Sequence, residues 1–401
     1  MLSFDEAQVF FASSIEPVAE KERIWLGGAA GRVLARDVVA CADAPSADKS
    51  AMDGYAIAMA DATVGRIFPV QQVCYAGMAP EALEPGHAIR LFTGSVMPAG
   101  ADTVIRAEEV EVCEGGVQLS TCREQGANVR RKGEDARMGD VMITSGTVLT
   151  AGHIATLASQ GIESVSAYRI VEVSLLITGD ELSFEDDVSS PHKVRDVNGP
   201  MLESMVESLG AIVVNRRHVG DDERELHQTI LELAGDSDIV LITGGTSGGE
   251  RDLVGPALIS AGGHLLCHKV GMTPGKPVTL GRVRNKIAVC LPGNPAAAYT
   301  TFALLVTPML RKLQGREAIF PPVRCVRTDL PEPAANDRDQ FFRASLSGSE
   351  NGCDRVTIHA QQGSGSVSLL GDAMGFVRIA PSARSHGKRL LPFYALDRWL
   401  S

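Results

Sequence analysis

The chain has 401 residues, 44% of them hydrophobic, and a formal net charge of -11. This length exceeds one ordinary hydrophobic core, so we expect several domains. The acidic balance argues against non-specific binding to nucleic acid or anionic membranes, because either partner would require a basic face. No apolar run reaches the roughly 20 residues of a membrane-spanning helix, and no secretory leader opens the chain. We therefore expect a soluble, cytoplasmic protein that binds neither nucleic acid nor membrane.

The eight cysteines are scattered along the chain and show no paired spacing. Zinc clusters and disulfide frameworks both place their cysteines in recognisable short patterns, and this sequence has none. We expect reduced thiols that are mostly buried, which fits a cytoplasmic protein.

In chain order, residues 1–42 begin with a helical pattern and then turn polar. Residues 43–141 are rich in proline and glycine, which is typical of short strands joined by turns. The helical pattern returns within residues 142–168. We therefore predict a β-rich domain over 43–141 that is inserted into an elongated, discontinuous helical domain made of 1–42 and 142–168.

Residues 169–316 alternate between apolar strands and amphipathic helices. Apolar strands between helices indicate a parallel sheet with ligands at the carboxyl ends of its strands. Prolines and alternating strands after this region predict a small C-terminal β domain over 317–401. The expected fold class is a multidomain, elongated molecule with a central α/β domain, an inserted β-rich domain and this C-terminal lobe. Strands are predicted over 171–178, 211–218 and 238–243, and helices over 200–209 and 222–233.

The segment Leu291-Pro292-Gly293-Asn294-Pro295 follows an apolar strand and precedes a helix. Asn294 suits the N-cap and Pro295 suits the first helical position, so the turn would aim backbone N–H groups and the positive helix end outward. A phosphate or carboxylate could bind there. A strand-to-helix corner without a ligand explains the turn alone equally well.

Four glycines fall within the six residues Gly244-Gly245-Thr246-Ser247-Gly248-Gly249, directly after a predicted strand. Glycine permits positive φ angles and close approach, so successive N–H groups can form an anion-binding nest. No Lys-Ser or Lys-Thr pair follows, so this is not a P-loop, and the spacing is not that of a dinucleotide-binding loop. A flexible glycine loop without a ligand accounts for the motif equally well.

Acidic and basic side chains accompany these two turns. Glu181 follows the first strand of the sheet and Asp252 ends the glycine-rich segment, and both carry the hard oxygen ligands that Mg²⁺ takes beside phosphates. Lys269 and Lys276 are cations suited to phosphate or another oxyanion. Each of these side chains, taken alone, could equally be a solvated surface charge.

The β-rich region holds a second set of polar motifs. Asp53 lies in a tight glycine turn flanked by apolar residues, over 50–56. The segment 128–135 combines three cations with two acids. This cluster could bind an anion or could form a solvated charged turn.

In order and spacing, these motifs resemble one family, the molybdopterin molybdenumtransferases of the MoeA type, which are related to the gephyrin E domain. The resemblance implies insertion of molybdenum from molybdate into adenylylated molybdopterin, with release of AMP and assistance by Mg²⁺. It also implies an elongated four-domain homodimer in which the α/β domain of one subunit faces the β-rich and C-terminal domains of the other. It covers essentially the whole chain through the segments 50–56, 93–102, 128–135, 178–182, 244–252, 274–277 and 291–295.

The resemblance also implies roles for individual residues. Matching acids would be catalytic or would arrange metal and phosphate, with Glu181 and Asp252 holding Mg²⁺; the four aspartates are Asp53, Asp135, Asp221 and Asp252. Expected partners are the small-molecule substrates and, transiently, the molybdopterin adenylyltransferase and recipient molybdoenzymes. Substrate or molybdate contacts are expected from Thr93, Arg130, Gly244, Gly245, Ser247, Lys269, Lys276, Pro292, Pro295, Arg343 and Ser364.

The sequence departs from the family pattern in places. Lys49 stands where the family usually has asparagine, and Thr273 stands where lysine usually precedes Pro-Gly-Lys-Pro. Thr246 and Gly248 also alter the glycine loop. The changes at 49 and 273 keep open a diverged paralogue that carries the cofactor or serves as a scaffold. The glycine loop that ends in Arg251-Asp252 also resembles that of the adenylylating enzymes, so a molybdopterin adenylyltransferase is the second alternative.

Overall fold

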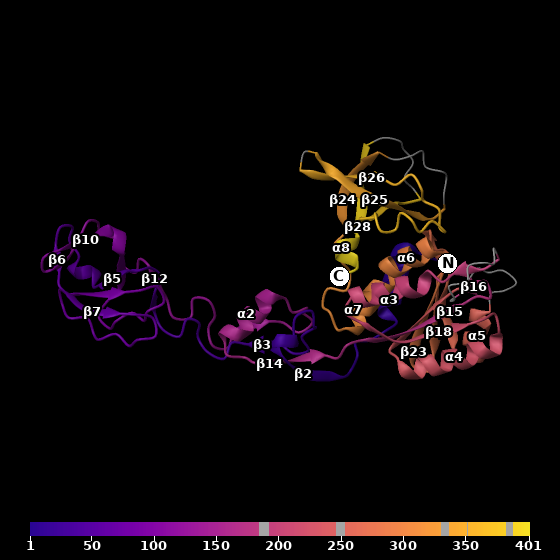
Figure 1. Cartoon of the computed structure of the whole chain (residues 1–401), viewed down its shortest axis with the longest axis horizontal. Coiled ribbons are helices and arrows are strands. Elements are labelled where there is room, and N and C mark those ends of the chain that lie inside the picture. Colours follow the sequence, from indigo (N-terminus) through magenta and orange to yellow (C-terminus); the bar gives the residue numbers. More distant parts are fainter. Residues whose placement is uncertain (184–191, 246–252, 330–336, 351, 382–387) are drawn as a thin grey trace.

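The computed structural model describes residues 1–183, 192–245, 253–329, 337–350, 352–381 and 388–401. The molecule is elongated, with a β-rich arm at one end, a smaller middle unit, and an α/β body at the other end (Figure 1). The C-terminal strands lie on one side of this body. In the described part of the chain, no helix is long and apolar enough to cross a membrane.

The body is built on a six-stranded sheet of order β18-β15-β19-β23-β22-β20. The first four strands are parallel, as predicted, whereas β22 runs antiparallel to both of its neighbours, β23 and β20. A short turn after β22, with Arg284 at a φ of 52°, returns the chain directly into β23, and a connection this short permits only antiparallel pairing. The strands are β15 (Glu172–Thr178), β18 (Ile212–Val219), β19 (Ile239–Thr243), β20 (His264–His268), β22 (Thr279–Val283) and β23 (Lys286–Leu291).

Helices cover both faces of this sheet because successive strand residues point to opposite sides. Leu175 and Ile177 of β15 share a core with α3 (Asn198–Ser208), while Leu176 between them shares a second core with α4 (Glu223–Asp236) and α5 (Val254–Ser260). The first core also holds one continuous helical stretch of α6 (Pro295–Thr301), the π-turn η4 (Phe302–Val306) and α7 (Thr307–Leu313).

The N-terminal helix α1 (Phe4–Ser13) belongs spatially to the body. Ser3 and Glu6 form a capping box at its start. Phe4 and Phe11 are fully buried in the core shared with α3 and η4, and β1 (Leu2–Ser3) pairs in parallel with β21 (Val270–Thr273). The first residues therefore pack on the α/β body and not on residues 142–168, with which the sequence analysis grouped them.

The arm and the middle unit are made of short strands. In the middle unit, β2 pairs with β14, β3 pairs with β13, and α2 (Ala151–Ser159) lies beside them (Figure 1). The strands of the middle unit are β2 (Lys21–Trp25), β3 (Val38–Val39), β13 (Val141–Ile143) and β14 (Ser164–Tyr168). The arm contains the sheets β7-β8-β5-β9, β10-β11-β6 and β12-β4, formed by β4 (Lys49–Ser50), β5 (Gly54–Ile57), β6 (Ile67–Phe68), β7 (Val70–Cys74), β8 (Ala88–Leu91), β9 (Thr103–Arg106), β10 (Val110–Cys113), β11 (Gly116–Leu119) and β12 (Val129–Arg130).

The C-terminal strands close into a barrel-like ring because β25 pairs with both β26 and β27, while β24 and β28 complete the circle. The strand β21 of the body pairs with β25, which ties the barrel to the body. A final short helix, α8 (Leu396–Trp399), packs its Trp399 into the body core. The barrel strands are β24 (Arg324–Asp329), β25 (Asp339–Glu350), β26 (Cys353–Ile358), β27 (Gly375–Ile379) and β28 (Lys388–Ala395).

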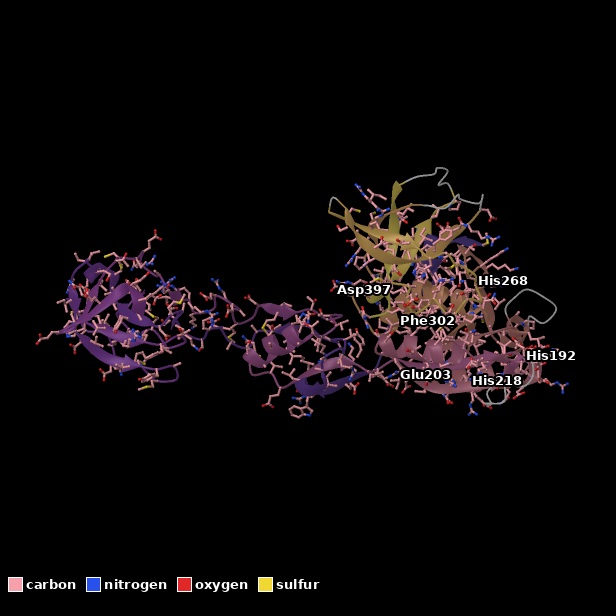
Figure 2. The ribbon with its side chains drawn as sticks, turned by 45° about the horizontal axis from the view of Figure 1, so that its top comes forward. His192, Glu203, His218, His268, Phe302 and Asp397 are labelled. Atoms are coloured by element: carbon pink, nitrogen blue, oxygen red, sulfur yellow. The ribbon has the colours of Figure 1, made fainter. Side chains whose placement is uncertain are left out.

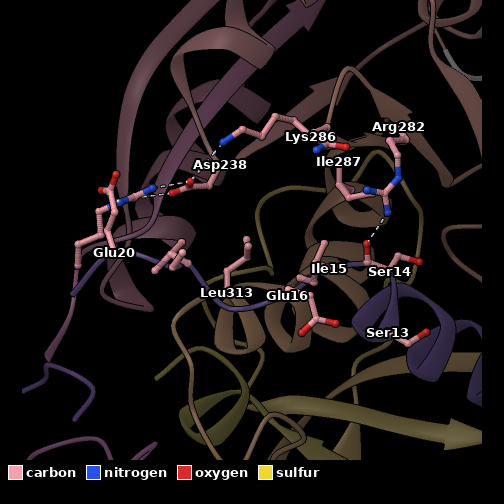
Figure 3. Close-up of a pocket in the computed structure, with 14 residues that line it drawn as sticks. Ser13, Ser14, Ile15, Glu16, Glu20, Asp238, Arg282, Lys286, Ile287 and Leu313 are labelled. Atoms are coloured by element: carbon pink, nitrogen blue, oxygen red, sulfur yellow. Dashed lines mark hydrogen bonds and ion pairs between the residues drawn. The ribbon is translucent and has the colours of Figure 1, made fainter. Parts of the chain in front are cut away.

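Arg169 fastens the body to the rest of the chain, next to a pocket of about 580 Å³ (Figure 3). Its guanidinium donates two hydrogen bonds of 2.7 Å to Asp238, at the amino end of β19, and one of 2.7 Å to Glu20. Asp238 also accepts from the Glu172 N–H at 3.0 Å and lies 3.5 Å from the Lys286 ammonium. One nearly buried carboxylate thus joins the two segments that enter the body.

We expect Asp238→Ala to lower the free energy of unfolding by about 2 to 3 kcal/mol, because it leaves two cations beside an uncompensated site. Urea denaturation measures the change. Glu203→Ala is the matched control, since it breaks the exposed Arg216–Glu203 pair and should cost less than about 1 kcal/mol. Equal losses in the two variants would contradict the role of Asp238.

The same carboxylate should make stability depend on pH. Burial opposes its ionisation, but hydrogen bonds from Arg169 and the Glu172 N–H outweigh burial, so the pKa of Asp238 lies below its ordinary 3.8. A lowered folded-state pKa adds stability above the unfolded-state value, and this stability is lost as the pH falls through the folded-state value. The stability difference between wild type and Asp238→Asn should therefore be constant near neutral pH and shrink below about pH 4. A difference that is constant down to pH 2 would be inconsistent with this coupling.

Candidate active site

A cleft of about 500 Å³ opens at the carboxyl ends of the parallel strands of the body. Its walls come from the segments that directly follow β15, β18, β19 and β23. His218, near the end of β18, lies 3.3 Å from the Gly179 carbonyl, and Figure 2 shows it at the end of the body remote from the arm. Six residues singled out from the sequence line this one cleft: Glu181, Asp221, Gly244, Gly245, Pro292 and Pro295.

The turn after β23 begins helix α6 as predicted, with Asn294 as the N-cap and Pro295 as the first helical residue. Asn294 is the N-cap through its carbonyl, which accepts from the N–H groups of Ala297 and Ala298. Its side chain donates instead to the Ser364 hydroxyl at 3.2 Å. The Ser364 carbonyl takes the Ala296 N–H at 2.9 Å, so one helix N–H expected to face a ligand is already used. This pairing brings Ser364 of the barrel to the edge of the cleft.

Two glycines after β19 are required by the backbone. Gly244 has a φ of +98°, and a Cβ there would lie 2.0 Å from the Thr178 carbonyl oxygen. Gly245 has a φ of +58° and faces Val254, so a side chain at either position would strain the turn. Ser247 and Asp252, the other predicted residues of this loop, lie outside the described residues.

Acidic groups gather on the opposite side of the cleft. A Cβ at Gly179 would lie 2.5 Å from a carboxylate oxygen of Glu181, so glycine makes room for that carboxylate over the backbone. Asp180 accepts from the Asp221 N–H at 3.0 Å, which brings β15 and β18 together at this edge. Over the described residues, no three metal-binding side chains converge on one point. Mg²⁺ commonly uses one or two carboxylates and completes its shell with phosphates and water, so Glu181 with one further acid fits that chemistry.

Asn198 is a cleft residue that the sequence analysis missed. It is 8% exposed and begins α3. Its side-chain amide donates to the Thr243 hydroxyl at 2.9 Å and to the Gly293 carbonyl at 2.7 Å, which ties together the ends of β19 and β23. Its Oδ1 is buried with no hydrogen-bond partner among the described residues. The polar run Asp196-Val197-Asn198-Gly199-Pro200 before a predicted helix was the available signal.

The remaining predicted cations of this end occupy other places. Arg343 is 1% exposed and donates to the Gln361 carbonyl at 2.8 Å, and its burial lowers the pKa of Arg343. It therefore holds the segment that leads to Ser364. Lys269 and Lys276 are half-buried beside β21 and do not line the cleft.

Four predicted residues, Asp53, Thr93, Arg130 and Asp135, lie in the arm, at the opposite end of the molecule (Figure 1). Asp53 accepts 2.8 Å hydrogen bonds from the N–H and the hydroxyl of Thr93, and these bonds lower the pKa of Asp53. Arg130 pairs with Asp135 and, at 2.7 Å, with Glu134. Because β4 pairs with β12, the two pairs lie on neighbouring segments. A single chain thus holds two separate groups of candidate site residues.

We expect Asn198→Ala to lower the free energy of unfolding by about 1 to 3 kcal/mol, because it removes both hydrogen bonds between the strand ends. Hydrogen exchange should accelerate at the backbone N–H groups of residues 296–298, which follow the turn that Asn198 holds. Asn285→Ala, at an exposed position, is the control and should change neither measurement. Unchanged exchange in Asn198→Ala would show that the turn holds without the amide.

Comparison with known proteins connects both ends of the molecule to one family. Residues 2–161 match the family described as MoeA N-terminal region (domain I and II), and residues 174–312 match the family described as probable molybdopterin binding domain. Solved structures include the molybdopterin biosynthesis MoeA protein of Pyrococcus horikoshii OT3, with a TM-score of 0.82, 27% identity and coverage of 98% of this chain and 100% of that one.

Curated relatives agree with these matches. The molybdopterin molybdenumtransferase of Haemophilus influenzae is 34% identical over 319 residues, which is 79% of each chain. The enzyme of the same name from a Nostoc species is 35% identical over 335 residues, covering 80% of this chain and 77% of the relative. The chain therefore belongs to the molybdopterin molybdenumtransferases, a family of transferases of molybdenum-cofactor biosynthesis.

Proposed function

We propose that this chain inserts molybdenum from molybdate into adenylylated molybdopterin and releases AMP. The observation that carries the proposal is the cleft at the carboxyl ends of β15, β18, β19 and β23, where glycine turns and carboxylates lie side by side. A bound phosphate would face the backbone N–H groups of the glycine-rich turn. The chain is also about one-third identical to transferases of this name over most of its length.

Residues of the cleft would position the substrate more than they would react with it. Gly244 and Gly245 permit the tight turn through which the backbone would approach a phosphate, and Asn198 holds the neighbouring strand ends in place. Glu181 and Asp252 would hold Mg²⁺, which neutralises phosphate charge when it is bound. Pro292 and Pro295 fix the turn on the far wall. Catalysis then depends on orientation and electrostatics, as in other phosphoryl chemistry.

The arm supplies the remaining acids from a second subunit. Asp53 and Asp135 cannot reach the cleft of their own chain, since they lie at the other end of the elongated molecule (Figure 1). In a homodimer with crossed arms, the arm of one subunit would deliver them to the cleft of the other, as the resemblance implies. Asp53 stays ionised because Thr93 donates to it twice. It then orients the attacking water or molybdate oxygen at the adenylate phosphorus.

The departures from the family pattern fall on both sides of this composite site. Lys49 pairs with Arg130 across β4 and β12, and Thr273 pairs with Gln340 at the barrel. Charge would be moved rather than removed, because the crossed dimer would bring Lys49 of one subunit toward the body of the other, where Thr273 replaces the family's lysine. The competing carrier function predicts tight binding of molybdopterin without turnover, and an adenylyltransferase would consume ATP without molybdate.

The cellular compartment and the partners of the protein follow from the same proposal. Cys41, Cys122 and Cys325 are exposed free thiols, which suits a reducing compartment such as the cytoplasm. The adenylyltransferase that makes the substrate and the enzymes that receive the cofactor would be transient partners. We propose domains over 43–141, 169–316 and 317–401. The middle unit would be formed by the segments that precede and follow the arm in the chain.

Complementation between inactive subunits tests the composite site. Asp53→Ala and Glu181→Ala should each abolish molybdate-dependent AMP release. When the two variants are co-expressed with different tags, random pairing gives half mixed dimers with one intact site each, so we expect about a quarter of the wild-type rate. AMP release with adenylylated molybdopterin, Mg²⁺ and molybdate measures this recovery.

Co-expression of Asp53→Ala with Asp135→Ala is the matched control, because both defects lie on the arm and every mixed dimer would have two damaged sites. Recovery should be absent in that pair. Absence of recovery in both pairs would contradict the crossed dimer. Absence of AMP release by the wild-type protein would contradict the proposed reaction itself.

A further inference from the structure

One face of the arm sheet carries two rows of side chains, and one of these rows includes Asp53. In the sheet β7-β8-β5-β9, Tyr55 lies opposite Arg90, and Arg90 lies opposite Val73. Continuing the same registers by two residues along β5 and β8 places Asp53 opposite Phe92. In the same register, Tyr75, after β7, lies opposite Phe92, after β8. Asp53, Phe92 and Tyr75 therefore form the outer of the two rows. Alternation along a strand puts both rows on one face.

Flat groups stack along these rows. The rings of Tyr75 and Phe92 are 4.7 Å apart and nearly parallel, at 9°. The Arg90 guanidinium lies 5.3 Å from the centre of the Phe92 ring and 4.6 Å from that of Tyr55. Tyr55 is 8% exposed and anchors the inner end of the stack. The stack therefore runs from the arm core to the surface.

The outer end of this stack is uncovered. Tyr75 is 54% exposed, although an aromatic ring gains most by burial. Met52 and Met78, from the two turns beside it, are also exposed, at 39% and 47%. The Ser95 hydroxyl donates to the Cys74 carbonyl at 3.1 Å and the Gly94 N–H donates to the Ser50 carbonyl at 2.8 Å. These bonds fix the turns that carry Tyr75, Thr93 and Asp53 relative to one another.

We propose that Tyr75, backed by Phe92 and Arg90, is a stacking platform for a fused heterocycle of the substrate. The inference rests on the proposed function, since adenylylated molybdopterin carries two such rings, a pterin and an adenine. Phe92 covers the face of Tyr75 that points toward Asp53, so a ring on the free face would extend the row outward and the Asp53 carboxylate would face a more distant part of the same substrate. Arg90 behind Phe92 adds a positive charge that influences Asp53. Tyr75 is a positioning residue: it places the adenylate for the groups that react.

Stacking suits this place better than a protein contact does. The platform is one exposed ring beside flexible methionines, with a carboxylate in the same row, whereas the centre of a protein interface is depleted of charge. Planar rings on aromatic side chains are bound largely regardless of their substituents. The platform therefore explains why the row that holds Asp53 and the half-buried Phe92 ends in an exposed ring.

Steady-state kinetics of AMP release with wild-type protein and Tyr75→Leu test the platform. Loss of one stacking ring should raise the KM for adenylylated molybdopterin about tenfold, and by more than any fall in kcat. Tyr75→Phe keeps the ring and should restore the low KM. Trp25→Leu removes another exposed aromatic side chain, 67% exposed on β2, and is the control with an unchanged KM. Circular dichroism and thermal unfolding confirm that all variants are folded.

Equilibrium dialysis with adenylylated molybdopterin, AMP and molybdopterin separates this inference from the proposed reaction. Weaker binding of AMP alone in Tyr75→Leu assigns the platform to adenine, and weaker binding of molybdopterin alone assigns it to the pterin. If the wild type binds but releases no AMP, and Tyr75→Leu still weakens binding, the platform stands while the proposed reaction fails. Wild-type KM and binding in Tyr75→Leu would overturn the platform, as would a change confined to the dimer–monomer equilibrium.

Discussion

The burial of the body sheet on both faces is the constraint on which the site depends. Strands β15, β19 and β23 are apolar along almost their whole length, and helices cover them on either side. Polar groups on such strands can be solvated only where the strands end. Parallel order brings these ends to one edge, so the glycine turn, the acids and the Pro-Gly-Asn-Pro turn meet there without any further device. Asn198 then fixes the spacing by bonding to two strand ends at once.

The opposite edge of the same sheet holds the junction between the body and the rest of the chain. Two chain segments enter the body there, and their direction sets where the arm points. Asp238 is held at this edge by Arg169, Lys286 and a backbone N–H. A carboxylate buried with several partners is costly to displace, so the arm leaves the body in a defined direction. A composite site between two subunits requires this, because an error of angle at the junction grows along the length of the arm.

Local patterns in the sequence predicted the elements of the body well. The strand and helix pattern over 171–243 is present with ends shifted by one to three residues, since apolar periodicity reports burial directly. The predicted N-terminal helix is present as α1, but its apolar face, with Phe4 and Phe11, gives no information about which core receives it. Asn294 and Pro295 begin α6 as predicted, but the partner of the Asn294 side chain, Ser364, is 70 residues away and could not be predicted from the local pattern.

The site could be predicted only where its residues follow neighbouring strands. Glu181, Gly244 and Pro292 fall in one cleft because sheet order brings them there. Arg343 resembled a substrate ligand, yet its long side chain is used inside the barrel to hold the Ser364 segment. The sequence pattern gave no indication of a role for Tyr75, because an aromatic residue after a short strand is ordinarily part of the core. Its meaning appears only in the register of three strands, which places an uncovered ring in the row of Asp53. In the crossed dimer that we propose, the arm would be half of a binding site, with the acid and the apolar surface on one face and the glycine-containing turns on the body of another subunit.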